Sequence, residues 1–158
     1  MTRQQALHKL WQRLFLVLAF LLAIAVGILF YADTARTGVL VFLIGNIGGY
    51  VGVHRGLADL KDPEVIELSE SWWAILSPSI VGGVLALVLY ILFLSGIVSG
   101  DLFPRFESNP DSPQGLDSLL TQHAKDMPAY AKLLFWSFMA GFNQKYAVDI
   151  ITSVRQKS

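Results

Sequence analysis

The sequence predicts an all-α integral membrane protein with four transmembrane helices and a short interfacial helix between the second and the third. Its 158 residues are 54% hydrophobic and 15% charged, with a mean hydropathy of +0.53. An ordinary soluble domain has about 25% charged residues. Four apolar runs also approach the roughly 20 residues that a helix needs to cross a bilayer. We therefore expect a single transmembrane domain over residues 1–158.

Composition and motifs argue against several classes of function. The formal net charge is zero, whereas a nucleic-acid surface needs a clustered basic excess. The chain has no cysteine, which excludes disulfides and thiolate metal sites. Its three histidines lie far apart in the sequence, and no nucleotide-binding or hydrolase motif is present. We expect no enzyme, no cofactor, no metal and no nucleic-acid partner.

The first predicted span covers residues 14–31, with the sequence LFLVLAFLLAIAVGILFY. Basic residues precede it, as they precede the apolar core of a signal peptide. The run is long, however, and no small-residue cleavage site follows before ADTARTG. We expect a retained helix, with a cleaved signal peptide as the alternative.

The second predicted span, residues 38–54, is rich in glycine. Several glycines are four residues apart, a small-xxx-small spacing that lets two helix backbones approach closely. This stripe could pack within the chain or between subunits. An asparagine amide in the same stretch needs a partner on another helix or in a wet cavity. The candidate packing residues are Gly45, Asn46, Gly48, Gly49 and Gly52.

An interfacial helix is predicted over about residues 63–76. Asp62 is placed to cap it, Pro63 suits its first turn, and apolar residues recur at helical period up to Leu76. Its acidic face could be merely solvated, or it could be a docking surface for a basic cytoplasmic partner. The candidate docking residues are Asp62, Glu64, Glu67 and Glu70.

The third predicted span covers residues 79–100 and is the most apolar. Pro78 suits its first turn, and Trp72 and Trp73 suit the headgroup layer just before it. We take these three residues as interfacial anchors. An outer loop over about residues 101–128 follows, either as a connector or as a cap over an outer vestibule.

The fourth predicted span covers about residues 129–150 and is amphipathic, with large aromatic residues opposite small or polar ones. Three interpretations remain open. The span could end near Phe142; its polar face could meet the second span and satisfy Asn46; or polar faces of several subunits could surround a water-filled path. The candidate polar-face residues are Ser137, Gly141, Gln144, Lys145, Asp149 and Thr152.

The positions of lysine and arginine predict the orientation. With both termini inside, the cytoplasmic segments hold eight of these residues and the outer loops hold four, which agrees with the positive-inside rule. The inner group is Arg3, Lys9, Arg13, Arg55, Lys61, Lys145, Arg155 and Lys157, and the outer group is Arg36, Arg105, Lys125 and Lys132. We expect an inner (cytoplasmic) membrane protein with both termini in the cytoplasm.

The second half of the chain resembles a group of small, largely uncharacterised bacterial membrane proteins. In these, a span headed by tryptophan and proline is followed by a polar loop and an AGF-[SN]-[EQ]-[RK]-[FY] segment. The matching residues here are Trp73, Pro78, Gly82, Gly83, Ala140, Gly141, Phe142, Asn143, Gln144, Lys145 and Tyr146. Asn143 and Gln144 replace the more familiar Ser-Glu, which removes an acid beside Lys145. The resemblance implies a bacterial membrane protein and no particular activity.

Two functional classes follow from these features. The first is a homo-oligomeric channel-like or membrane-perturbing effector, packed through the glycine stripe and lined by the polar face of the fourth span. The alternative is a non-conducting membrane anchor or sensor subunit that recruits a cytoplasmic protein through the acidic face. A transporter is a third, weaker interpretation, because four spans without a detectable inverted repeat are few for alternating access.

Overall fold

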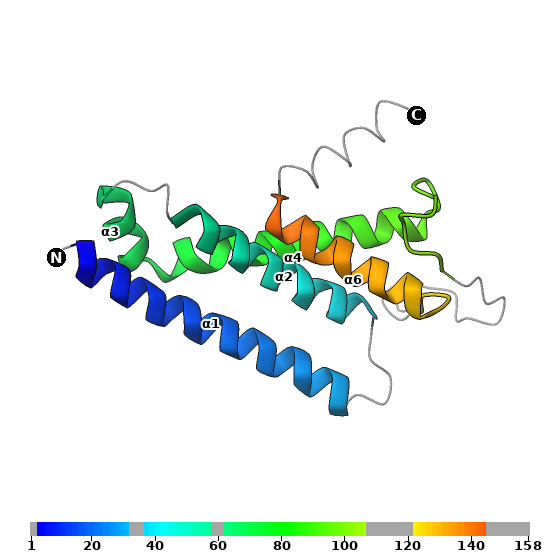
Figure 1. Ribbon diagram of the computed structural model, residues 1–158, viewed down its shortest axis with the longest axis horizontal. Helices are drawn as coiled ribbons and strands as arrows, with labels where there is room; N and C mark the ends of the chain where they lie inside the picture. Colours follow the sequence, from blue (N-terminus) through cyan, green and yellow to red (C-terminus); the bar gives the residue numbers. More distant parts are fainter. Residues whose placement is uncertain (1–2, 32–36, 58–61, 107–121, 145–158) are drawn as a thin grey trace.

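The computed structural model describes residues 3–31, 37–57, 62–106 and 122–144. The described residues form five helices and no strand, so the all-α prediction is confirmed for this part of the chain (Figure 1). The helices are α1 (Arg3–Tyr31), α2 (Thr37–Gly56), α3 (Asp62–Glu70), α4 (Trp72–Leu94) and α6 (Met127–Phe142).

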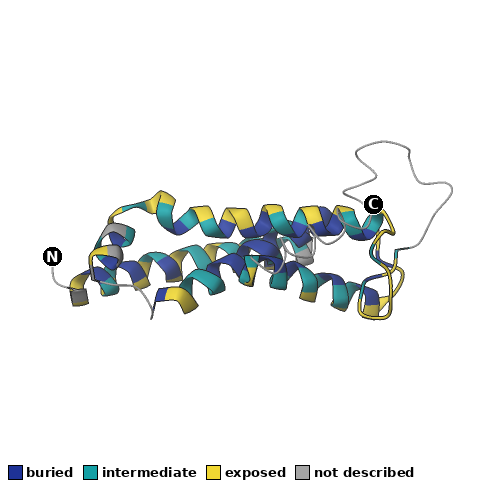
Figure 2. Cartoon of the chain, turned by 90° about the horizontal axis from the view of Figure 1, so that it is seen from above, coloured by how far each residue is buried: buried dark blue, intermediate teal, exposed yellow. Residues whose placement is uncertain are grey.

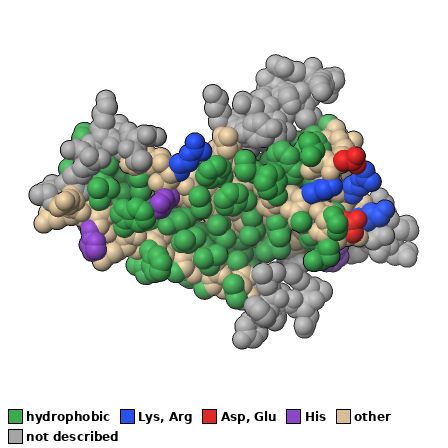
Figure 3. Space-filling model, viewed as in Figure 1, with side chains coloured by type: hydrophobic (Ala, Val, Ile, Leu, Met, Phe, Trp, Pro, Cys, Tyr) green, Lys and Arg blue, Asp and Glu red, His purple; other side chains and the backbone are tan. Residues whose placement is uncertain are grey.

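Three of these helices are long and apolar enough to cross a membrane, which agrees with the predicted membrane location. They are the segments Gln4–Ile28, Thr37–Gly56 and Trp72–Leu94. Helix α6 has 16 residues and is therefore about 24 Å long, against a hydrocarbon core of about 30 Å. Figure 3 shows hydrophobic side chains across the middle of one face and most of its visible charged side chains toward one end.

Helices α2, α4 and α6 form the core of the molecule. Their facing sides carry buried residues along most of their length, whereas the outer sides are exposed (Figure 2). In the most apolar 18 residues of each helix, 56% are buried in α2 but only 11% in α1. The main buried cluster consists of Val41, Ala86, Leu89, Tyr90, Phe93, Leu133 and Ala140.

Helix α1 packs on this core mainly near its N-terminal end. Leu10 and Leu14 are fully buried there in a second cluster with Tyr50, Leu57 and Ile75 of the other elements. Farther along, α1 separates from the other helices (Figure 1). Much of its surface is therefore apolar and exposed: Trp11, Phe15, Leu16, Phe20, Leu22 and Val26.

Helix α3 is docked against the N-terminal part of α1. Val65 and Ser69 are fully buried, and the guanidinium of Arg13 donates a hydrogen bond of 2.7 Å to the carbonyl of Ser69. The predicted interfacial helix is therefore present but shorter than expected, because it ends at Glu70 and not at residue 76.

The boundary between α3 and α4 corrects two sequence predictions. Ser71 has extended backbone angles (φ −101°, ψ 116°), and its hydroxyl accepts a hydrogen bond from the N–H of Ala74. Serine is among the strongest N-cap residues, so α4 begins at Trp72 and not near residue 79. Pro78 consequently lies inside the helix. Apolar spacing alone missed this boundary, because apolar residues continue across the cap.

Helix α4 also ends earlier than the predicted residue 100. Its last residue is Leu94, and Ser95 donates its hydroxyl to the carbonyl of Leu92. Gly96 then has a φ of +72°, a left-handed conformation that commonly follows a helix end. The six residues up to Gly100 therefore belong to the turn that follows the span.

The segment after this turn is packed on α6. The ring of Trp136 stacks on Phe103 with a centroid separation of 5.4 Å, and its indole N–H donates to the carbonyl of Leu102. The backbone N–H of Lys125 donates to the carbonyl of Arg105, which joins the two described ends of the loop. This part of the loop packs along the side of α6 as far as Trp136. Residues 107–121 lie outside the described residues.

Helix α6 begins at a well-formed cap and ends within the predicted fourth span. The carboxylate of Asp126 accepts a 2.8 Å hydrogen bond from the N–H of Ala129. At the other end, Asn143 leaves the helical conformation (φ −122°, ψ 73°), although its N–H still donates to the carbonyl of Met139. The predicted continuation to residue 150 lies outside the described residues.

Candidate functional site

The candidate site lies where α2, α4 and α6 touch backbone to backbone. A Cβ placed on Gly45 would lie 2.7 Å from the carbonyl oxygen of Gly82 in α4. A Cβ on Gly82 would lie 2.9 Å from the Cα of Gly141 in α6, and one on Gly141 would overlap the carbonyl oxygen of Gly45. The three glycines therefore occupy one level of the bundle, where no larger residue fits without moving a backbone.

The glycine stripe of α2 faces both neighbouring helices. A Cβ on Gly49 would lie 2.6 Å from the carbonyl oxygen of Pro78 in α4. On the other side, a Cβ on Gly52 would lie 2.9 Å from the carbonyl oxygen of Phe142, and Gly48 packs in the same way on Phe138. Of the two arrangements that the spacing allowed, these glycines are used for packing within the chain.

Asn46 is bonded inside the bundle and is only 4% exposed. Its amide group donates 2.8 Å to the carbonyl of Phe42, one turn earlier in α2. The hydroxyl of Ser79 in α4 donates to the backbone carbonyl of Asn46 at 2.8 Å and lies 3.4 Å from its side-chain oxygen. The partner of Asn46 is therefore α4, not the polar face of α6.

Sequence reasoning did not single out Ser79. The signal was available, because Ser79, Gly82, Gly83 and Ala86 are small residues at steps of three, one and three along one face of α4. All four are buried. A small polar residue on such a face is the natural hydrogen-bond partner for a polar group on the facing helix.

The described part of the predicted polar face of α6 is turned into the chain. Ser137 is 2% exposed, and its hydroxyl donates to the carbonyl of Leu133 at 2.7 Å. Gly141 is buried against Gly45. These two residues therefore do not line a path between subunits in this arrangement. Lys145, Asp149 and Thr152 lie outside the described residues.

A cavity of about 270 Å³ lies beside the end of α6. Gln144 closes one side of it, because its side-chain amide donates 2.7 Å to the carbonyl of Pro78. Pro78 lies about 9 Å along α4 from Trp72, at 1.5 Å of rise per residue, so this amide reaches a level inside the span. The lining residues are Gly49, Gly52, Val53, Pro78, Gly141, Phe142, Asn143 and Gln144.

The cavity suits water and polar groups. The last carbonyls of a helix lack partners within it and carry a partial negative charge. Non-helical backbone at membrane depth is tolerated only where protein buries it or water reaches it. A cavity of 270 Å³ exceeds by far the roughly 30 Å³ that one water occupies. Water in this cavity can therefore reach the carbonyl groups at the end of α6. No group of three metal-binding side chains occurs among the described residues.

The predicted anchors Trp72 and Trp73 lie at the start of α4, and the predicted docking residues lie on α3. Trp73 is 77% exposed and Trp72 is 45% exposed, with the Arg13 guanidinium carbon 4.5 Å from the centre of its ring. Pro78, the third predicted anchor, belongs to the cavity and not to the interface. Glu70 is exposed, whereas the side chains of Asp62, Glu64 and Glu67 lie outside the described residues.

The described geometry thus joins residues from two predicted groups. The glycines of α2, predicted for helix packing, meet Gly141 and Gln144, predicted for a polar face, at one cavity. Comparison with the models of known protein families, with curated proteins and with solved structures found no match for this chain.

Proposed function

We propose that the protein is a small inner-membrane subunit with four spans that does not conduct ions by itself and presents α3 to a cytoplasmic partner. The observation that carries this proposal is the closure of α2, α4 and α6 on one another. Ser79, Asn46 and Ser137 are all at least 96% buried and hydrogen-bonded within the chain. A pore between subunits needs polar groups that face outward from the subunit.

Helix α6 is the fourth span in this proposal. It lies along α2, and its last turn reaches Gly52, within about 6 Å of the end of α2 at 1.5 Å per residue. Four spans place both termini on one side, and the excess of lysine and arginine in the inner segments favours the cytoplasm.

Helix α3 would serve as the docking element. Burial of Val65 and Ser69 and the hydrogen bond from Arg13 hold one side of this short helix against α1. Its opposite side is therefore presented in a fixed orientation. Because the helix carries several acidic residues and Glu70 is exposed, a basic surface is the expected partner.

A homo-oligomeric channel-like or membrane-perturbing effector is the second candidate, and one observation favours it. The cavity beside Gln144 provides room for water at a level inside the span. If several subunits brought these cavities together, they could form a hydrated path.

Ion flux into liposomes separates the two candidates. We expect liposomes that contain the purified wild-type protein to pass potassium no faster than empty liposomes. The Gln144→Glu variant, which places an acid at the cavity, should be equally silent. A flux above the empty control that Gln144→Glu alters would replace the proposed function with the channel.

The docking role needs its own measurement. Chemical crosslinking in cells should join the wild-type chain to its partner. This crosslink should disappear when Glu64, Glu67 and Glu70 are changed together to lysine. The matched control is Glu107→Lys, a single reversal in the predicted outer loop. If the triple variant keeps the same crosslinked proteins as the control, the acidic side of α3 is not the docking surface.

The cysteine-free sequence makes the topology directly testable. Ser99 and Glu70 are both exposed and lie beyond opposite ends of α4. The experiment uses cells whose outer membrane has been removed and whose inner membrane is still closed. An impermeant maleimide should label Ser99→Cys in these cells, and it should label Glu70→Cys only after the inner membrane is opened. The reverse pattern would invert the proposed orientation.

A further inference from the structure

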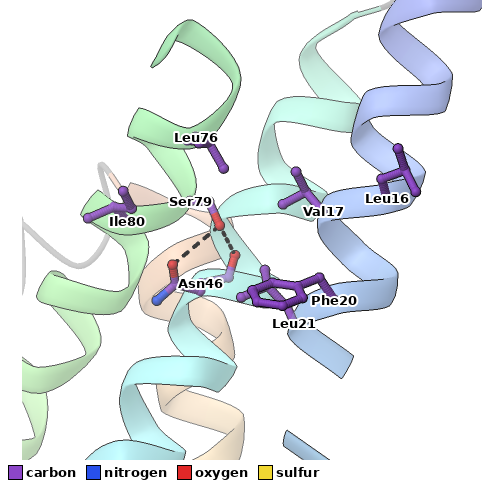
Figure 4. Close-up of a pocket in the computed structure, with 8 residues that line it drawn as sticks. All are labelled: Leu16, Val17, Phe20, Leu21, Asn46, Leu76, Ser79 and Ile80. Carbon is purple, nitrogen blue, oxygen red and sulfur yellow. Dashed lines mark hydrogen bonds between the residues drawn. The ribbon is translucent and has the colours of Figure 1, made fainter. Parts of the chain in front are cut away.

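A second cavity, of about 290 Å³, lies between α1 and α4, with α2 forming its floor (Figure 4). Its walls are apolar side chains from two of the candidate spans. The polar atoms at its floor belong to Asn46 and Ser79, which are hydrogen-bonded to each other. The lining residues are Leu16, Val17, Phe20, Leu21, Asn46, Leu76, Ser79 and Ile80. We call this cavity the α1–α4 groove.

The groove has a basic and aromatic end. Arg13 lies one turn before Val17 on α1, and Trp72 lies one turn before Leu76 on α4. The guanidinium carbon of Arg13 is 4.5 Å from the centre of the Trp72 ring, so these two residues bridge the helices where the groove begins. Lys9, one turn farther along α1, adds a second positive charge at this end.

The sides of the groove are open to the surroundings. Phe20 is 67% exposed, Leu16 is 61% exposed and Ile80 is 43% exposed. Because these residues lie in apolar membrane-spanning segments, their surroundings are hydrocarbon. Lipid acyl chains are therefore the groups that contact this surface.

The size of the groove selects among possible occupants. One turn of a partner helix, about 10–12 Å across and 5.4 Å long, needs more space than the groove offers. A segment of a single extended hydrocarbon chain needs less space and fits. The planar guanidinium of an arginine can donate two parallel hydrogen bonds to phosphate oxygens. Arg13 uses one of its five N–H donors for the carbonyl of Ser69, so four remain for a phosphate.

We propose that the α1–α4 groove binds an anionic phospholipid, with one acyl chain between Phe20 and Ile80 and the phosphate on Arg13 beside Trp72. Charge complementarity selects the anionic lipid over a zwitterionic one. Tryptophan at this level suits the headgroup layer, so the lipid lies in the leaflet from which α1 and α4 both begin.

Native mass spectrometry of the full chain in detergent tests the proposal. The protein is stripped of lipid and then exposed to phosphatidylglycerol or phosphatidylcholine with identical acyl chains. We expect one phosphatidylglycerol to be retained per chain, with about a fivefold preference over phosphatidylcholine, as one arginine contact provides. Equal retention of the two lipids, or retention of a second protein copy in place of lipid, would overturn the proposal.

Variants locate the bound lipid. Arg13→Gln should remove most of the preference and leave only the part that Lys9 provides, whereas Arg13→Lys, which keeps the charge, should retain more of it. The matched control is Arg55→Gln, which removes the same charge beside Phe142, away from the groove. Ile80→Trp should fill the groove and lower the retention of both lipids. An unchanged preference in Arg13→Gln together with unchanged retention in Ile80→Trp would place the lipid elsewhere.

Discussion

Gly141 of α6 lies against the backbone carbonyl of Gly45 in α2, so closely that an added Cβ would overlap the carbonyl oxygen. Gly141→Ala should therefore lower the free energy of unfolding in detergent by about 1–3 kcal/mol, the usual range for overpacking. The control is Gly27→Ala in α1, where an added Cβ meets nothing within 4 Å. It should be neutral or slightly stabilising. Equal unfolding midpoints for the two variants would contradict the backbone contact.

The hydrogen bond between Ser79 and Asn46 should make a small but measurable contribution to the free energy of unfolding. Ser79→Ala removes the hydroxyl that donates to the carbonyl of Asn46. Bonds of this kind in membrane proteins average about 0.6 kcal/mol, so we expect a loss of that size in a denaturant titration. Ser77→Ala, an exposed change in the same helix, should leave the midpoint unchanged. A larger effect at Ser77 than at Ser79 would refute the assignment.

Gln144 should control access of water to the cavity at the end of α6. Single cysteines can report this, because the natural chain has none. We expect a water-soluble maleimide to label Val53→Cys, and to do so faster when Gln144→Ala removes the amide that binds the carbonyl of Pro78. Leu89→Cys, which is 1% exposed in the core, should stay unlabelled. Protection of Val53→Cys in both backgrounds would mean that the cavity is dry.

The N-cap at the start of α4 predicts how replacing Ser71 changes the free energy of unfolding. Its hydroxyl accepts the N–H of Ala74, and loss of an N-cap typically costs about 1 kcal/mol. Ser71→Ala should therefore lower the unfolding free energy by about that amount, and Ser71→Asp should restore most of it. The measurement is the same denaturant titration. If Ser71→Ala has no effect, the helix does not begin at Trp72.

Features set by local chemistry could be predicted from the sequence. Four apolar runs predicted four spans, and three of these runs correspond to described helices that are long and apolar enough to cross a membrane. The described helix of the fourth run, α6, has 16 residues and falls short of that length. The four-residue spacing of the α2 glycines correctly indicated close helix packing. The spacing could not identify the neighbours, because Gly82 and Gly141 lie far along the chain.

The errors arose where two local signals competed. Pro78 suits the first turn of a helix, but Ser71 is the stronger start signal, and the proline is accommodated seven positions later. Apolar spacing also carried the predicted interfacial helix past Glu70, because apolar residues recur at helical period on both sides of the Ser71 cap. The partner of Asn46 depended on tertiary packing, which brought Ser79 and not α6 to its side.

Helix α2 packs against α4 with one side and against α6 with the other, and these two neighbours are synthesised one after the other. Because α4 precedes α6 in the chain, Gly45 and Gly49 can meet α4 before α6 has been synthesised. The side that carries Gly48 and Gly52 then touches only lipid. Small-residue faces attract any helix that can approach closely. The interval before α6 emerges is therefore the time at which the nascent chain is most exposed to pairing with the wrong helix, and the arrival of Phe138 and Phe142 ends it.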